Sequence, residues 1–225
     1  MKLIKCVSAL LVALAAVAAT SAAQAGDLAA TVDLGTTGLG LHLTAPLATQ
    51  LNARVGLNYA SYSYDGNTSD VDYDFKLKLA TVDALLDYHP FDSGFRVSGG
   101  VVYNGNKIEA QAKPKNGTYT LNGRTYPSAL VGKLDGNIDF RKAAPYLGIG
   151  WGNAVKAAGW GFGMDVGVTF QGSPKTALTN SGCTAPAAVC TQIASDVATE
   201  NAKLADEVKD FKLYPVVRVG VSYRF

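Results

Sequence analysis

Apolar and polar residues alternate along most of this 225-residue chain, most clearly in its last thirteen residues. There, one set of alternate positions is apolar or aromatic from Leu213 to Phe225, and the other contains Arg218, Ser222 and Arg224. Successive side chains of a strand point to opposite faces, so this segment predicts a β-strand with one apolar and one polar face. The apolar face meets a core in a soluble sandwich, and it meets lipid in a transmembrane barrel, where the polar face lines the lumen.

The same alternation recurs in seven earlier segments, which bring the number of predicted strands to eight. These segments are residues 39–45, 51–59, 80–88, 95–104, 130–141, 146–151 and 159–171. Their apolar faces approach the 9–11 residues that a tilted strand needs to cross the hydrocarbon layer, and aromatic residues cluster near their ends, as in interfacial girdles. No apolar run of 18 residues follows residue 25, which excludes spanning helices. We therefore predict an all-β fold, an antiparallel up-and-down transmembrane β-barrel of eight strands.

The connections between these strands leave a ten-strand barrel open as an alternative. With eight strands and both chain ends in the periplasm, the short turns 46–50 and 89–94 fall outside the cell, and the longer links 62–72 and 106–129 fall inside. Barrels of this type usually have short periplasmic turns and long external loops. Two further strands, at residues 28–34 and 175–179, would restore that arrangement. Residues 28–34 alternate acceptably and residues 175–179 poorly, and eight strands remain the preferred number.

The N-terminal 25 residues have the composition of a secretory signal peptide. Lys2 and Lys5 precede an apolar run at residues 7–19, and the cleavage-site pattern Ala23-Gln24-Ala25 follows. The run is too short to span a membrane as a helix. We predict cleavage after Ala25 and a single mature barrel domain at residues 26–225.

Charge and histidine content narrow the possible chemistry. The full chain has a formal charge of +2, and loss of Lys2 and Lys5 with the signal leaves the mature chain neutral, which gives no indication of a nucleic-acid partner. The two histidines differ in setting, since His42 falls on an inward face and His89 in a turn. We find no Ser–His–acid set, paired-histidine metal motif or phosphate-binding glycine loop. The sequence therefore predicts no catalytic residue, no metal site, no cofactor and no enzyme activity.

The last long connection, residues 173–210, contains two distinct features. Cys183 and Cys190 are close together in an exported chain, so a disulfide that closes a small loop is expected. Residues 189–211 place apolar side chains at helical spacing, which predicts an amphipathic helix. This helix could fold over the barrel rim, or it could act as a partner-binding arm or a lumen plug. In the earlier link, Asn122-Gly123 predicts the turn of a small hairpin.

The predicted inward face carries charges of both signs in nearly equal number. Because an eight-strand barrel is just wide enough for its own side chains, these charges must pair. A selective pore would favour one sign of charge along its wall, so a salt-bridged, closed lumen is expected. The predicted lumen network consists of Arg54, Asp83, Asp87, Arg96, Lys133, Asp135, Asp139, Arg141, Asp165 and Arg218.

The signal peptide, the alternating strands and the aromatic C-terminus together resemble the small outer-membrane barrels of Gram-negative bacteria, the OmpA, OmpX and OmpW kind. The resemblance covers essentially the whole mature chain, as architecture. It implies a bacterial outer-membrane location, contact with outer-membrane lipid and lipopolysaccharide, and recognition of Tyr223 and Phe225 by the barrel-assembly machinery. A structural or interaction role is the expected function. The alternative is a narrow, porin-like channel for small solutes, which ten strands would favour.

Overall fold

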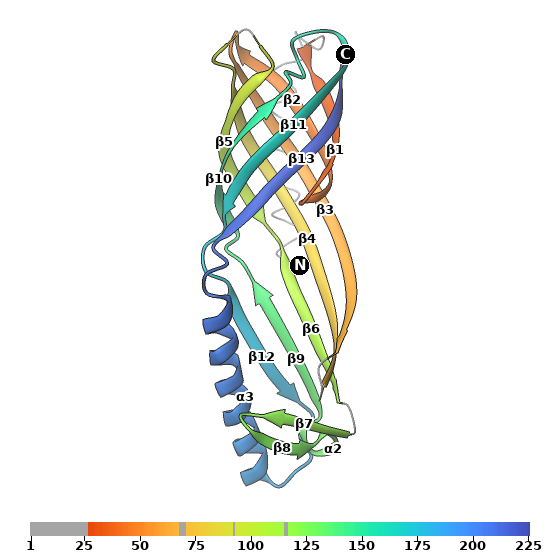
Figure 1. Cartoon of the computed structure of the whole chain (residues 1–225), viewed down its shortest axis with the longest axis vertical. Helices are drawn as coiled ribbons and strands as arrows, with labels where there is room; N and C mark the ends of the chain where they lie inside the picture. Colours follow the sequence, from red (N-terminus) through yellow and green to blue (C-terminus); the bar gives the residue numbers. More distant parts are fainter. Residues whose placement is uncertain (1–26, 68–70, 92, 115–116) are drawn as a thin grey trace.

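The computed structural model describes residues 27–67, 71–91, 93–114 and 117–225, and the predicted signal peptide at residues 1–25 lies outside them. Eight strands form a closed antiparallel ring in the order β1-β2-β3-β4-β5-β10-β11-β13, and β13 pairs with β1 to close it (Figure 1). Their bounds are β1 Ala29–Gly35, β2 Gly38–Ala48, β3 Leu51–Asn67, β4 Val71–Tyr88, β5 Phe95–Asn104, β10 Ala143–Trp151, β11 Gly159–Phe170 and β13 Leu213–Arg224. The predicted fold class and the strand number are confirmed.

One of the eight predicted strands is not part of the ring. Residues 130–141 contain β9 (Lys133–Asp139), which pairs with β6 (Lys107–Pro114) and β12 (Lys175–Ser181) outside the barrel. Its place in the ring is taken by β1, the segment that the ten-strand alternative added. The alternation of β9 is real, but it serves a sheet with one side on a protein core, and alternation alone does not separate that case from a barrel wall.

With β1 in the ring in place of β9, the short turns and the long connections no longer lie at the unexpected ends of the barrel. With β1 as the first strand, both described chain ends and three turns (Ala48 to Leu51, Tyr88 to Phe95 and Trp151 to Gly159) lie at one end of the barrel. The two long insertions, residues 105–142 and 171–212, lie at the other end (Figure 1). This is the usual arrangement of short periplasmic turns and long external segments.

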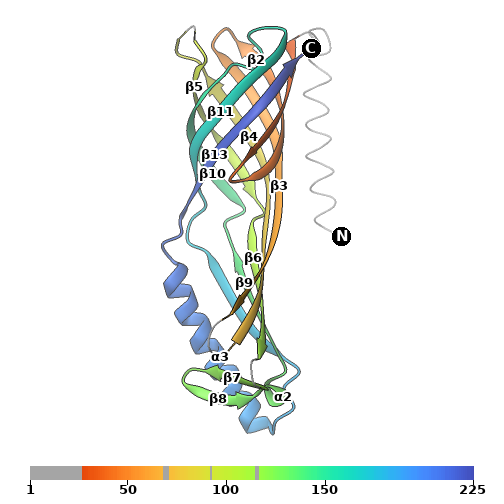
Figure 2. The same ribbon diagram turned by 45° about the vertical axis from the view of Figure 1, so that its right-hand side comes forward.

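The sheet continues beyond the barrel because β3 and β4 are unusually long, at 17 and 18 residues. The second half of β4, from Thr81, pairs with β5 in the barrel, and its first half pairs with β6. Strands β3, β4, β6, β9 and β12 thus form a sheet that projects from the barrel along the long axis of the molecule (Figure 2). We call this sheet and the elements packed on it the arm.

The arm has an apolar core of its own. Helix α3 (Ala187–Val208) packs against β12, and the hairpin of β7 (Thr118–Leu121) and β8 (Arg124–Pro127), followed by α2 (Ser128–Val131), covers the far end. The core consists of Ala112, Tyr119, Leu121, Val131, Leu134, Ile193 and Val197. The predicted amphipathic helix is therefore confirmed, but it covers the arm and neither plugs the barrel nor folds over its rim. Among the described residues, no helix is both long and apolar enough to cross a membrane.

Local details of the arm follow the sequence signals. The hairpin turns at Asn122 and Gly123, which have φ of 50° and 75°, as a two-residue turn of this type requires. Cys183 and Cys190 form a disulfide across a sequence separation of 7 residues, which joins the loop that precedes α3 to the first turn of the helix.

The barrel wall has the polarity of a membrane protein. Outward-facing side chains are large, apolar and exposed, for example Leu41 at 57%, Ile149 at 53% and Phe162 at 78%. The inward-facing set is buried and mostly polar, with one apolar cluster of Leu85, Val102, Tyr146 and Val216. This exposed apolar wall needs a lipid solvent, since a soluble protein of this size does not expose a continuous apolar belt.

Candidate functional site in the barrel lumen

The lumen is crossed by ion pairs between opposite walls of the barrel. Arg54 on β3 and Asp165 on β11 are four positions apart in the eight-strand ring, and Arg54 Nη1 lies 2.7 Å from Asp165 Oδ2. Arg54 Nε lies 2.9 Å from Asp87 Oδ2 on the neighbouring strand β4. Each of these three side chains is nine-tenths or more buried. One guanidinium therefore bridges the full width of the bore.

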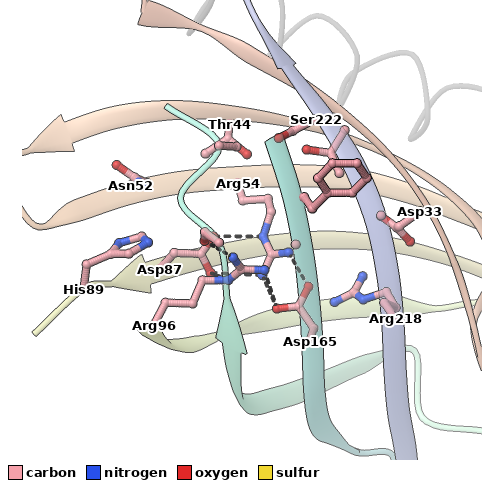
Figure 3. Close-up of a pocket in the computed structure, with 16 residues that line it drawn as sticks. Asp33, Thr44, Asn52, Arg54, Asp87, His89, Arg96, Asp165, Arg218 and Ser222 are labelled. Carbon is pink, nitrogen blue, oxygen red and sulfur yellow. Dashed lines mark hydrogen bonds and ion pairs between the residues drawn. The ribbon is translucent and has the colours of Figure 1, made fainter. Parts of the chain in front are cut away.

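Further groups complete this first cluster (Figure 3). Arg96 Nη2 donates to Asp165 Oδ1 at 2.8 Å, and Arg96 Nη1 donates to the carbonyl oxygen of Gly152. Ser98 donates its hydroxyl to Asp87 Oδ1 at 2.5 Å. Two guanidinium groups face two carboxylates, so the formal charges cancel. Such balance is what a buried ionic cluster needs to remain charged, because an unpaired buried ion has a large desolvation cost.

A second cluster lies nearer the arm. Asp83 on β4 and Arg218 on β13 are again four positions apart in the ring, and Asp83 Oδ2 lies 2.6 Å from Arg218 Nη1. His42 lies between two carboxylates, with Nδ1 2.6 Å from Asp33 and Nε2 3.1 Å from Asp83. Arg218 Nη1 also lies 3.0 Å from His42 Nε2, and because a guanidinium N–H can only donate, Nε2 accepts from Arg218 when it carries no proton, while Nδ1–H donates to Asp33.

Neutral side chains support the second cluster. Asn58 donates to Asp83 Oδ2 at 3.0 Å and to the Thr81 hydroxyl at 3.0 Å. The Arg218 guanidinium lies 5.8 Å from the centroid of the Tyr146 ring, within range of a cation–π contact. These contacts hold the charged groups in single positions across the bore.

Glycine makes room for the largest side chains of the lumen. Gly56 on β3 is directly opposite His42 on β2, and a Cβ at position 56 would overlap the imidazole ring. Gly148 and Gly167 lie beside the Tyr146 hydroxyl in the same way. The abundance of inward glycines therefore reflects space taken by other side chains in a bore of this width.

Little space remains between the two clusters. The cavity bounded by Asp33, Arg54, Asp87, Asp165 and Arg218 measures about 30 Å³, and the one beside Asp83, Tyr146 and Arg218 about 10 Å³. Cavities of this size hold one or two water molecules and no larger solute. In this conformation the lumen is closed.

The predicted lumen residues divide into two groups. The structure brings together Arg54, Asp83, Asp87, Arg96, Asp165 and Arg218 inside the barrel. Lys133, Asp135 and Asp139 lie instead on β9 in the arm, and Arg141 lies in the exposed link that follows it. The assignment of these four to the lumen is corrected, because β9 is not a barrel strand.

Two important lumen residues were absent from the predicted network. Asp33 was missed because its strand, β1, was not counted among the eight, although Thr31 and Asp33 alternate with Val32 and Leu34. His42 was predicted to face inward, but nothing in the sequence indicates that Asp33 and Asp83 flank it. His89, the second histidine, is buried in the turn after β4, where its backbone N–H donates to Gln50 O at 2.8 Å.

The histidine and serine side chains of the two lumen clusters contact carboxylates. Both ring nitrogens of His42 face carboxylates, and the Ser98 hydroxyl donates to Asp87. No group of three or more His, Cys, Asp or Glu side chains in this part of the chain could hold a metal ion.

In sequence comparisons, the chain matches no protein-family model and no curated protein. Solved structures do match it. The crystal structure of Acinetobacter baumannii CarO is similar over 88% of this chain and 97% of that chain, with 22% identity and a TM-score of 0.54. A. baumannii CarO2 gives 20% identity, coverage of 88% and 98%, and a TM-score of 0.54. A major outer membrane protein of Thermus thermophilus gives 15% identity, coverage of 88% and 99%, and a TM-score of 0.43.

The fold of this chain is that of an outer-membrane β-barrel protein. The likeness to CarO extends over nearly the whole of both chains, so it includes the arm as well as the barrel. At this level of identity the comparison concerns the fold alone, so the description of the lumen residues depends on the geometry of this chain and not on the comparison.

Proposed function

We propose that this protein is a non-conducting, non-enzymatic barrel of the bacterial outer membrane that anchors the arm outside the cell for an interaction role. The single observation that carries the proposal is the bridge formed by Arg54 between Asp87 and Asp165, which crosses the bore from wall to wall. A channel would need a continuous path, and the two cavities that the lumen clusters leave are water-sized, while the larger hollow of about 560 Å³ is lined by the turns around Gln50, His89 and Asn153. Ten strands would favour the channel alternative, and the ring has eight.

The construction of the arm supports an interaction role. Its own apolar core, its disulfide and the packing of α3 on the sheet give it more internal order than a membrane anchor requires. External segments positioned by a rigid barrel are the usual place for binding functions in such proteins. The exposed side of α3 and the Cys183–Cys190 loop are therefore proposed as the contact surface.

Planar-bilayer recording tests the proposal directly. Purified full-length protein is expected to give no reproducible single-channel steps at neutral pH. The Arg54→Ala variant is the informative companion, since it removes the group that crosses the bore. Reproducible steps from the unmodified protein would overturn the non-conducting assignment and favour the narrow channel. Lipopolysaccharide profiles that change with the presence of the protein would contradict the non-enzymatic assignment.

The C-terminal aromatic pair is proposed to serve assembly. Tyr223 packs against Trp160 with ring centroids 5.1 Å apart, and Phe225 is 64% exposed at the end of the strand that closes the ring. Because β13 must be delivered before the barrel can close, an exposed terminal aromatic is well placed for recognition by the assembly machinery. Phe225→Ala is expected to lower the amount of inserted protein, whereas Phe91→Ala, an exposed aromatic in a turn, should not. Equal insertion of both variants would contradict this role.

A further inference from the structure

The outer face of the sheet changes from apolar to polar at a single level. On β3, the outward series runs from Leu57 and Tyr59 to Ser61 and Ser63; on β4, it runs from Val82 and Ala80 to Lys78 and Lys76. Tyr59 pairs with Ala80, and Ser61 pairs with Lys78. The boundary therefore crosses both strands at the same register position, and we take it as the external edge of the apolar belt.

The first row beyond this boundary is rich in lysine. Strand register places five residues side by side across the five strands of the arm: Ser61, Lys78, Lys107, Asp139 and Lys175. We call these residues the basal row. They share the outer face of the sheet, opposite the face that α3 covers, because the core residues Ala112 and Leu134 occupy the alternate positions.

The height of the basal row matches the headgroup layer. Two residues of strand advance about 6–7 Å, and less along the membrane normal when the strand is tilted. The polar layer on each side of the hydrocarbon is about 5–8 Å thick. Lysine side chains at this level are therefore within reach of lipid headgroups.

The carboxylates beside the basal row neutralise only part of its lysine charge. Glu109, one row further from the membrane, is shared by Lys78 at 2.5 Å and Lys107 at 2.6 Å. Hydrogen bonds from Lys107 and then Lys78 lower the pKa of Glu109 to about 2, so it carries a full charge at neutral pH. One carboxylate thus faces two ammonium groups, and the group of three side chains retains a net positive charge.

The same imbalance holds around Asp139. Its register partners are Lys107 and Lys175, and Lys142 Nζ lies 4.0 Å from its carboxylate. Counting the basal row together with its immediate neighbours, five lysines (Lys76, Lys78, Lys107, Lys142 and Lys175) face two carboxylates (Glu109 and Asp139). Further out on the same face, Asp74 and Asp135 balance Lys113 and Lys133. Positive charge is therefore concentrated at the level of the headgroups.

We propose that the basal row binds the phosphate groups of lipopolysaccharide in the outer leaflet. The inference rests on the proposed function, since it requires the arm to lie outside the cell. Two observations carry it: the row continues directly from the apolar belt that contacts the bilayer, and its net charge is opposite to that of lipid phosphate. Binding there would fix the height and orientation of the arm, because the lysines lie on one side of the barrel only.

Binding of lipopolysaccharide to full-length protein in detergent, followed by titration, tests the proposal. The basal variant is K78Q/K107Q/K175Q, and the matched control K113Q/R124Q/K133Q removes the same charge at a distance from the membrane. A juxtamembrane lysine is worth roughly a fivefold change in affinity for anionic lipid. The basal variant is expected to bind at least tenfold more weakly, and the control within twofold of the unmodified protein. Equal affinity of all three proteins, or an equal loss in both variants, would overturn the proposal.

Three additional measurements make the outcome specific. K78R/K107R/K175R keeps the charge and should bind as the unmodified protein does, which separates charge from folding. If the triple glutamine variant does not fold, K175Q against K133Q replaces it, with a fivefold loss expected for K175Q alone. Dephosphorylated lipopolysaccharide should bind all variants equally, and competition by millimolar inorganic phosphate as effective as that by lipopolysaccharide would exclude a lipid site.

The result can be separated from the proposed function. Single-channel recording on the same preparations tests whether the barrel conducts, independently of lipid affinity. A silent protein whose lipopolysaccharide affinity does not depend on the basal row would leave the proposed function in place and remove this inference. A conducting protein with the expected lysine dependence would do the reverse.

Discussion

Asp83 and Arg218 lie on opposite walls of the barrel, 135 residues apart in sequence, and their side chains meet at 2.6 Å. Arg54 and Asp165 make a second contact of the same kind, 111 residues apart. Each pair joins strands that share no backbone hydrogen bonds, so the two pairs act as cross-braces inside the ring. They close the bore and also tie together strands that the sheet alone connects only through the perimeter.

The first prediction concerns the stability of this cross-bracing. Arg54→Ala leaves Asp87 and Asp165 buried without their main partner, and we expect the free energy of unfolding to fall by about 3–5 kcal/mol. Urea unfolding of the refolded protein in detergent measures the change. Arg141→Ala, which removes the same side chain from an exposed position, should cost no more than about 0.5 kcal/mol. Adding Asp165→Asn to Arg54→Ala should recover part of the loss, and a further loss would show that the two side chains do not act as a pair.

How much of this arrangement the sequence predicts depends on the distance over which each signal acts. Alternation predicts which side of a strand faces inward, and it placed Arg54, Asp83 and Arg218 correctly. The turn at Asn122-Gly123 and the helix before β13 were also predictable, because both depend on residues close in sequence.

Partners across the bore and strand membership were not predictable in the same way. Which arginine meets which aspartate depends on strand order and shear around the ring, which alternation does not encode. Residues 130–141 alternate as well as a barrel strand does, yet Leu134 packs on the core of the arm. Local alternation shows that a strand has one apolar and one polar face, and it does not show whether the apolar face contacts lipid or a protein core.

The second prediction concerns the attachment of the β7–β8 hairpin to α3. Asp196 on α3 accepts hydrogen bonds from the Tyr126 hydroxyl at 2.5 Å and from Asn122 Nδ2 at 3.3 Å. The Tyr126 hydrogen bond is the main cause that lowers the pKa of Asp196 below its ordinary value. A group with a lowered pKa stabilises the folded state at pH values above its unfolded pKa, and this stabilisation is lost as the pH falls through the folded value.

Hydrogen exchange at the hairpin measures this effect. Amide protection of residues 118–127 should be constant from pH 7 to pH 5, after correction for intrinsic rates. It should decrease once the pH falls below the ordinary pKa of an aspartate. Asp196→Asn should show reduced protection already at pH 7 and little further change in acid. The exposed Asp206→Asn on the same helix is the control, and an identical acid response in it would assign the effect to another group.

The third prediction concerns the disulfide at the start of α3. Cys183 and Cys190 close a small loop, and Cys183 also packs on the core of the arm. For a loop of this length the chain-entropy argument gives about 2–3 kcal/mol of stabilisation. Reduction, or Cys183→Ser with Cys190→Ser, should therefore make the segment around residues 183–190 sensitive to limited proteolysis. The barrel itself should keep its heat-modifiable migration in gels, and loss of that migration would show that the disulfide supports the barrel as well.

The last prediction concerns the orientation of the chain in the membrane. Because the native cysteines of the mature chain are joined to each other, single introduced cysteines can be labelled against a low background with a membrane-impermeant thiol reagent. Thr125→Cys, on the hairpin at the far end of the arm, and Ser63→Cys, one row beyond the basal row on β3, should both be labelled on intact cells. Thr49→Cys, in the short turn after β2, should be labelled only after the outer membrane is permeabilised. Leu57→Cys faces lipid two residues below Tyr59, so it should react in neither case. Labelling of Thr49→Cys on intact cells, with protection of Thr125→Cys, would invert the barrel and place the arm in the periplasm. A reactive Leu57→Cys would instead move the membrane boundary that the change from Tyr59 to Ser61 defines.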